Sequence, residues 1–323
     1  MMKITTFHSA ARAATLAGVA ALVAPVAQAQ DYPSRTIEVI HEYGPGGGTD
    51  RFIRAVAQPL SEITGEQMVP ISVQGGGGVP AYTNFIQRPA DGHSLLGLGP
   101  AQVIGHIQGR MDLDELMPLA RVQYDQALLW VPADSPHETL DDFLAAAKEN
   151  PGRVTVGVTG AAGFDDVVVG LLGLESDTML TTVPFSSSEM VSNTLGGQVT
   201  AMFEEYGPAR GLAESGDMRA LAVFSEERLD ALPDVPTAAE LGYDVTLGRW
   251  RAFAMHADDD AAQAQTLYDA IEEAVAAESY KEFEAQNALQ YRSELIGLEE
   301  FQAFVDSEVE TYTTVLRELG YIE

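Results

Sequence analysis

Three glycine-rich turns are the residues best suited to chemistry in this sequence. They read Tyr43-Gly-Pro-Gly-Gly-Gly-Thr-Asp50, Gly75-Gly-Gly-Gly-Val-Pro80 and Thr159-Gly-Ala-Ala-Gly-Phe-Asp165. Each leaves unpaired backbone N–H groups at a helix start, where they and the helix dipole suit a carboxylate or another acceptor group. Glycine lets a ligand approach the main chain closely. A single turn of this kind usually contacts no ligand. Three of them at equivalent positions predict a site that binds a ligand through main-chain donors.

Motifs for catalysis and for phosphate binding are missing. The first turn lacks the Gly-Lys-[Ser/Thr] ending of a P-loop, and Thr49 stands where a dinucleotide fingerprint requires its third glycine. No Gly-x-Ser-x-Gly elbow occurs, and no glycine brackets the serines 186–188. The six histidines are scattered without metal-ligand spacing, and there is no cysteine. We therefore expect neither an enzyme, nor a cofactor, nor a metal site.

Two groups of acids could still carry chemistry. Glu204 and Glu205 are adjacent, but neighbouring residues of a strand point to opposite faces. We therefore expect that they cannot share a proton and that at most one of them faces a ligand. The run of aspartates 258–260 lacks the spacing of a calcium loop and is interpreted as an exposed acid cluster.

The pattern of elements predicts an α/β fold. In the first half, strands at 36–41, 67–73 and 94–98 alternate with helices that begin near Asp50 and Pro80. After a boundary near 128–132 the alternation restarts, with strands at 154–158, 181–184, 199–203 and 218–224. Strand–helix alternation of this length predicts parallel sheets with helices on both faces. Ligands of such sheets bind at the carboxyl ends of the strands.

These elements predict the periplasmic binding protein fold, in which two doubly wound lobes are joined by a hinge and separated by an interlobe ligand cleft. Lobe 1 is expected at residues 30–130 and lobe 2 at residues 131–249. The helical stretches 260–278 and 298–319 are expected to return to lobe 1, so that residues 250–323 complete it.

The amino terminus and the composition indicate export. Residues 1–29 carry Lys3 and Arg12, an apolar stretch and Ala27-Gln28-Ala29, which together are typical of a cleaved signal peptide. The signal peptide contains two of the 18 basic residues and none of the 48 acidic ones, so the mature chain has a net charge of 16 − 48 = −32. Such an acidic surface repels nucleic acid and anionic lipid. We expect a soluble periplasmic monomer without disulfides.

Several segments together resemble one family, the Bug-type substrate-binding receptors of tripartite tricarboxylate transporters. The first glycine turn resembles the family's aromatic-x-x-Gly-Gly-x-Thr-Asp segment, and Leu195-Gly-Gly-Gln-Val199 is another family-like turn. Pro89-Ala-Asp-Gly-His-Ser-Leu95 is similar to the turn and strand that follow the second glycine-rich turn in this family. The strongest resemblance lies in Gly216-Asp-Met-Arg-Ala-Leu-Ala-Val223 and Leu232-Pro-Asp-Val-Pro-Thr-Ala-Ala-Glu-Leu-Gly242.

The resemblance implies a receptor that captures a small organic acid or a related metabolite and passes it to a two-component membrane permease. It implies one set of cleft residues in lobe 1: Tyr43, Gly46, Gly47, Thr49, Asp50, Gly77 and Gly78. It implies a second set in lobe 2: Gly160, Gly163, Asp166, Ser187 and Glu204. A ligand-sensing adaptor for a membrane signalling protein is the alternative, and the sequence does not separate the two roles.

Departures from the family pattern bear on the ligand. Asp166 stands at the position of a usual histidine, Glu42 replaces a usual proline, and Phe185 replaces a common tyrosine. A usual asparagine is missing from Ser72-Val-Gln74. A buried, unpaired acid facing a carboxylate would cost several kcal/mol. The ligand would then carry an amine, a hydroxyl or no charge at the end that faces Asp166; alternatively, Asp166 caps its helix in solvent.

Overall fold

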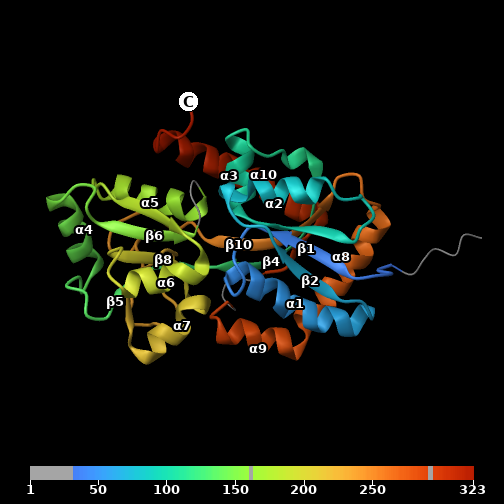
Figure 1. Ribbon diagram of the computed structural model, residues 1–323, viewed down its shortest axis with the longest axis horizontal. Helices are drawn as coiled ribbons and strands as arrows, with labels where there is room; N and C mark the ends of the chain where they lie inside the picture. Colours follow the sequence, from blue (N-terminus) through green and yellow to red (C-terminus); the bar gives the residue numbers. More distant parts are fainter. Residues whose placement is uncertain (1–31, 160–162, 290–293) are drawn as a thin grey trace, which may run out of the picture. The chain divides into compact units, whose positions relative to one another are not determined.

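Two mixed β-sheets covered by helices make up the described part of the chain (Figure 1). The computed structural model describes residues 32–159, 163–289 and 294–323, without the side chains of Ser187 and Ser188. The predicted signal peptide lies outside these residues. Among the helices of the described ranges, none has the length and apolar character needed to cross a membrane.

The first sheet has the order β11-β4-β10-β3-β1-β2. Its strand β1 is parallel to β2 and β3, whereas β10 is antiparallel to β3 and β4. The bounds are β1 Ile37–His41, β2 Met68–Ser72, β3 Ser94–Leu98, β4 Leu116–Asp125, β10 Arg249–His256 and β11 Ile296–Gly297.

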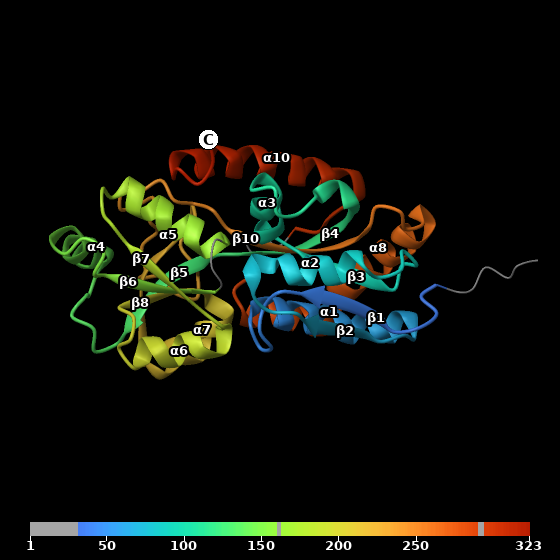
Figure 2. The same cartoon turned by 45° about the horizontal axis from the view of Figure 1, so that its top comes forward.

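Helices cover both faces of this sheet. On one face, α1 (Gly48–Thr64) packs against α8 (Ala261–Ala276) and α9 (Glu278–Gln286), and Phe52 stacks on Phe253 at 4.8 Å between ring centroids. The other face carries α2 (Val79–Ile86), α3 (Pro100–Ile107) and α10 (Leu298–Glu318). Figure 2 shows α10 running alongside α3 and reaching α5 (Phe164–Glu175), a helix that covers the second sheet.

The second sheet has the order β7-β6-β8-β5-β9, with β6 parallel to β7 and β8 and with β5 antiparallel to β8 and β9. Alternation along β8 sends Met202 to the core beneath α6 and α7, and Ala201 and Phe203 to the core beneath α4 and α5. The strand bounds are β5 Ala127–Pro132, β6 Thr155–Thr159, β7 Thr181–Phe185, β8 Ala201–Glu205 and β9 Met218–Val223. The helices are α4 Leu140–Glu149, α5 Phe164–Glu175, α6 Ser187–Leu195 and α7 Tyr206–Ser215.

The α/β class is confirmed, but the prediction of parallel sheets is wrong. Both sheets contain antiparallel strands, and the two long strands β4 and β10 were not predicted at all. Both strands carry charged residues, such as Arg121 and Arg251, which interrupt the apolar pattern although these side chains are buried. Apolar runs of buried strands also look alike in parallel and antiparallel pairs.

The chain passes between the sheets at two places. Only the buried Gln126 separates β4 of the first sheet from β5 of the second, and the chain re-enters the first sheet at Arg249. Strand β5 pairs entirely within the second sheet, although its first residues, 127–130, were assigned by sequence to lobe 1.

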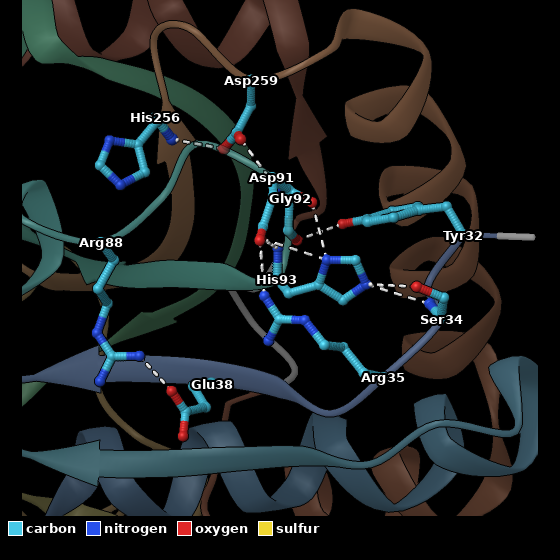
Figure 3. A network of polar contacts seen from close by, with 10 residues as sticks. All are labelled: Tyr32, Ser34, Arg35, Glu38, Arg88, Asp91, Gly92, His93, His256 and Asp259. Atoms are coloured by element: carbon cyan, nitrogen blue, oxygen red, sulfur yellow. Dashed lines mark hydrogen bonds and ion pairs between the residues drawn. The ribbon is translucent and has the colours of Figure 1, made fainter. Parts of the chain in front are cut away.

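A polar network fixes the start of the described chain against two loops of the first sheet (Figure 3). The Tyr32 hydroxyl donates to the Gly92 carbonyl at 2.5 Å, and Arg35 pairs with Asp91 at 2.8 Å. The Asp259 carboxylate accepts from the backbone N–H groups of Gly92 and His256, both at 2.9 Å. The family-like segment 89–95 therefore has a structural role here.

The interpretation of residues 258–260 as an exposed acid cluster is wrong for its middle member. Asp259 is 7% exposed and joins two loops, whereas Asp258 is exposed and Asp260 caps α8 through the Ala262 N–H at 2.8 Å. A run of three identical residues does not indicate which of them the chain buries.

The substitution Asp259→Ala should lower the free energy of unfolding by about 2–4 kcal/mol, because it leaves two buried N–H groups without acceptors. Asp258→Ala is the matched control and should change little, since that side chain is exposed. Urea unfolding of both variants measures the difference. Equal stability of the two variants would remove Asp259 from this structural role.

Candidate functional site

A pocket of about 560 Å³ opens where loops of the two sheets face each other. One wall follows β1 and β2, and the other follows β6 and β7. These strand pairs are parallel within each sheet, so their carboxyl ends, and the loops that follow them, lie at the same edge. The first wall is lined by Glu42, Tyr43, Gly44 and residues 74–78, together with Arg110; the second is lined by Thr159, Pro184, Phe185, Ser186 and Glu189.

Backbone geometry explains the glycine run of the first wall. Gly75, Gly76, Gly77 and Gly78 all have positive φ, at 97°, 57°, 59° and 86°. L-residues rarely adopt this conformation, so the turn that leads into α2 requires glycine at each position. A Cβ atom at Gly78 would also lie 3.2 Å from Met111 Cε and 3.6 Å from Glu42 Cδ. The main chain therefore forms this part of the wall.

The second wall is held by a reciprocal cap at the start of α6. The Ser186 hydroxyl donates to Glu189 Oε2 at 2.6 Å, and the Ser186 N–H donates to the same oxygen at 3.4 Å. These hydrogen bonds lower the pKa of Glu189. The Ser186 N–H is thus satisfied by the protein itself rather than left free for a ligand.

Behind the pocket lies a cluster of buried charges, which we call the strand-crossing network: Asp125, Asp165, Glu205, Arg249 and Arg251. The two arginines are two residues apart on β10 and therefore face the same side. Arg249 pairs with Asp165 and, at 2.5 Å, with Glu205. Arg251 pairs with Asp125 at 2.8 Å and with Glu205 at 3.1 Å. Asp125 and the two arginines belong to the first sheet. Glu205 comes from β8 of the second sheet, and Asp165 comes from α5.

The network reaches both walls of the pocket. The Thr159 N–H and hydroxyl donate to Asp165 Oδ2 at 2.7 and 2.6 Å. The Arg249 guanidinium carbon lies 5.3 Å from the centroid of the Tyr43 ring, close enough for a cation–π contact. Thr159 and Tyr43 both line the pocket. The buried charges therefore position one residue of each wall.

The acids of this region respond differently to burial. Burial raises the pKa of Glu205, but Arg249 and Arg251 outweigh it and bring this pKa down to about 2. Burial raises the pKa of Asp125 to about 6, because Arg251 offsets it only in part. Burial and the neighbouring Glu205 raise the pKa of Glu204 well above its ordinary value. Glu205 is therefore the acid that both arginines hold ionised.

The expectation that Glu204 and Glu205 cannot share a proton is wrong. A hydrogen bond between the two carboxyl groups contributes to their opposite pKa shifts. Glu205 is the last residue of β8 and caps α7, so the strict alternation of strand side chains ends there. Glu204 Oε1 also accepts from the Glu205 N–H at 3.1 Å.

The structure brings only some of the predicted lobe 1 residues to the pocket. Tyr43, Gly77 and Gly78 line it, whereas Gly46, Gly47, Thr49 and Asp50 are not among its lining residues. The Gly46 N–H donates to Asp50 Oδ2 at 3.0 Å, and Gly47 caps α1. The Thr49 hydroxyl accepts from Arg251 Nε at 3.3 Å. Asp50 pairs with Arg54 at 2.9 Å, so its role here is to fold the turn.

The predicted lobe 2 residues are more dispersed. Gly163 caps α5, and Ser187 is the first residue of α6. Asp166 is close enough to Tyr321, near the carboxyl terminus, to raise the pKa of that residue, though burial raises it more. Glu204 is buried in β8, and neither it nor Asp166 is among the residues that line the pocket. Gly160 lies outside the described residues.

Sequence reasoning missed several residues of the site. Thr159 and Glu189 line the pocket, and Glu42, which was noted only as a departure from the family, lies in its wall. It also missed the strand-crossing network, although Arg249-Trp250-Arg251 offered a signal. Two arginines separated by one residue within an apolar run indicate a strand face that requires buried acids.

Nowhere in the described ranges do three or more histidine, aspartate or glutamate side chains gather as a metal site would require.

The substitution Glu205→Gln should lower the free energy of unfolding by about 3–5 kcal/mol at neutral pH, because it breaks a buried ion pair on both arginines. The folded-state pKa of about 2 lies below the ordinary 4.5, so the contribution of Glu205 is present above pH 4.5 and is lost as pH falls towards 2. The difference between wild type and variant should therefore shrink in acid.

Urea unfolding at several pH values measures this difference. Glu214→Gln is the control, since Glu214 forms an exposed pair with Arg210 and its loss should have little effect. A difference that is independent of pH would contradict the assigned charge state of Glu205.

Several known proteins are similar in sequence to most of this chain. The model for the tripartite tricarboxylate transporter family receptor matches residues 52–321. Protein BugT of Bordetella pertussis is 29% identical over 310 residues, which cover 93% of this chain and 94% of BugT. A protein from the tcbD-tcbE intergenic region of a Pseudomonas strain is 31% identical over 239 residues, 71% of each chain.

Solved structures share the fold. The periplasmic binding protein BugD superposes with a TM-score of 0.83 at 21% identity, covering 90% of this chain and 99% of BugD. An R. palustris protein solved with adipate has a TM-score of 0.80 at 21% identity, covering 90% and 99% of the two chains. MatC from Rhodopseudomonas palustris, solved with malate, has a TM-score of 0.80 at 20% identity, covering 88% and 100%. The match of the family model over most of the sequence, on a fold of this kind, shows that the chain belongs to the tripartite tricarboxylate transporter receptors, which are substrate-binding proteins and not enzymes.

Proposed function

We propose that this chain is a periplasmic receptor that captures a small carboxylate-bearing metabolite for a tripartite tricarboxylate-type permease. The observation that carries the proposal is the pocket whose walls come from both sheets. Its volume of about 560 Å³ is suited to a small molecule rather than to a polymer. Membership of the receptor family supports the same role.

The nature of the walls favours a ligand with acceptor groups. The first wall is main chain over residues 75–78, and α2 begins directly after it. N–H groups at a helix start suit a carboxylate. The related proteins that were solved with adipate and malate carry dicarboxylates, which supports a carboxylate at one end of the ligand here.

Capture by closure is part of the proposal. Lobe 1 is built on the first sheet and lobe 2 on the second, and the chain crosses between them near Gln126 and Arg249. A ligand held by both walls favours the closed state by its additional contacts. A cleaved signal peptide at residues 1–29 exports the protein, which acts as a monomer and presents its closed form to the permease.

The substitution Gly44→Leu should abolish ligand binding, because the new side chain projects from a residue that lines the pocket. The fold should tolerate it: an added Cβ would meet only the flexible end of Gln74, at 3.3 Å. Native mass spectrometry of protein exported to the periplasm detects the ligand that copurifies. Wild type should carry a small molecule, and the variant should not.

Gly211→Leu on the exposed side of α7 is the control, since an added Cβ there meets nothing within 4 Å. It should retain the ligand. Retention of the same ligand by Gly44→Leu would place binding elsewhere, and chemical conversion of the ligand by the wild type would contradict a receptor role.

A further inference from the structure

Glu42 lies in the pocket wall, and no positively charged residue that the structure describes in the first sheet pairs with its carboxyl group. It directly follows β1, and its Oε2 atom is buried without a hydrogen-bond partner among the described residues. Gln102 and Tyr43 lie beside its carboxyl group and stabilise the charge only in part, so that burial raises the pKa of Glu42. An acid in such surroundings requires either a proton or a positive partner.

No lysine, arginine or histidine of the described residues forms an ion pair with Glu42. The buried guanidinium group of Arg249 acts on Glu42 through its charge, but it is already paired with Asp165 and Glu205. In the strand-crossing network three carboxyl groups share two guanidinium groups, so negative charge is in excess behind the pocket.

The rest of the wall does not reverse this balance. Its other charged residues are Glu189, which the Ser186 cap keeps ionised, and Arg110, whose Nε donates to Gln108 at 3.0 Å. A dianion would add two further negative charges to a pocket that holds one arginine. A molecule with one carboxylate and one ammonium group adds none and supplies the missing partner.

We propose that Glu42 selects a ligand that carries a protonated amine at one end and a carboxylate at the other. This rests on the proposed function, since it assigns the ligand class of the same pocket. The ammonium group pairs with the Glu42 carboxylate, and the carboxylate end faces the main-chain donors of the glycine run. Asp166, whose charge the sequence suggested as the selector, does not line the pocket.

Matched pairs of compounds test this selection. γ-Aminobutyrate and succinate, δ-aminovalerate and glutarate, and ε-aminocaproate and adipate differ mainly by an ammonium group in place of one carboxylate. Isothermal titration of ligand-free wild type should show at least one amino acid binding about tenfold or more tighter than its dicarboxylate, because a buried charge pair contributes on this scale.

Glu42→Gln should then weaken binding of that amino acid by about 10- to 100-fold and leave the dicarboxylate unchanged or tighter. Glu62→Gln, which removes the same charge from the exposed side of α1, is the control and should preserve the preference. The variant keeps the size of the side chain, so loss of folding does not explain a change of preference.

The contrary outcomes are distinct. A wild type that prefers dicarboxylates, with that preference retained in Glu42→Gln, would mean that Glu42 is protonated and donates to a carboxylate, because the glutamine amide donates in the same way. An unchanged preference, or no binding of any member by wild type, would also overturn the proposed selection. A copurified ligand that Gly44→Leu loses would still support the receptor role in each of these cases, whereas its absence would count against the receptor itself.

Discussion

Two buried guanidinium groups on one strand are the constraint on which the rest of this structure depends. Arg249 and Arg251 are buried where the chain re-enters the first sheet at β10, so each guanidinium group requires carboxylate partners there. The first sheet supplies only Asp125, so Glu205 and Asp165 must approach from the second. A buried ion network of this kind adds little net stability compared with an apolar core, but its geometry is specific. Its contribution is to fix how the ends of these strands meet.

The pocket follows from that arrangement. Thr159 is held by Asp165 and Tyr43 lies against Arg249, so the network positions a residue in each wall without itself contacting the pocket. Main chain in a glycine-only conformation forms most of the remaining first wall. Main-chain donors suit many acceptor groups equally, which leaves selection to the few side chains that interrupt them. Glu42 is the most exceptional of these, because it is an acid in a wall that otherwise suits anions.

The sequence predicted local features well and their assembly less well. The glycine turns were identified because their chemistry is visible in a few adjacent residues, and Tyr43, Gly77 and Gly78 do line the pocket. Strands β4 and β10 were missed because Arg121, Asp125, Arg249 and Arg251 break the apolar pattern, and those charges are tolerable only beside partners far away in sequence. A large sequence separation also concealed Asp165. It lies next to Asp166, which was predicted as a site residue, but its partner Arg249 is 84 residues away in the sequence. Pairing at that separation is a property of the fold rather than of any local pattern.

Hydrogen exchange with and without bound ligand tests the central claim, that one small molecule is enclosed by loops of both sheets. The amides of residues 75–79 and of residues 185–190 should slow together when the ligand is added, while those around residues 91–93, in the polar network of Figure 3, should not change. Slowing confined to one of the two loops, with the ligand fully bound, would contradict an enclosure formed by both walls.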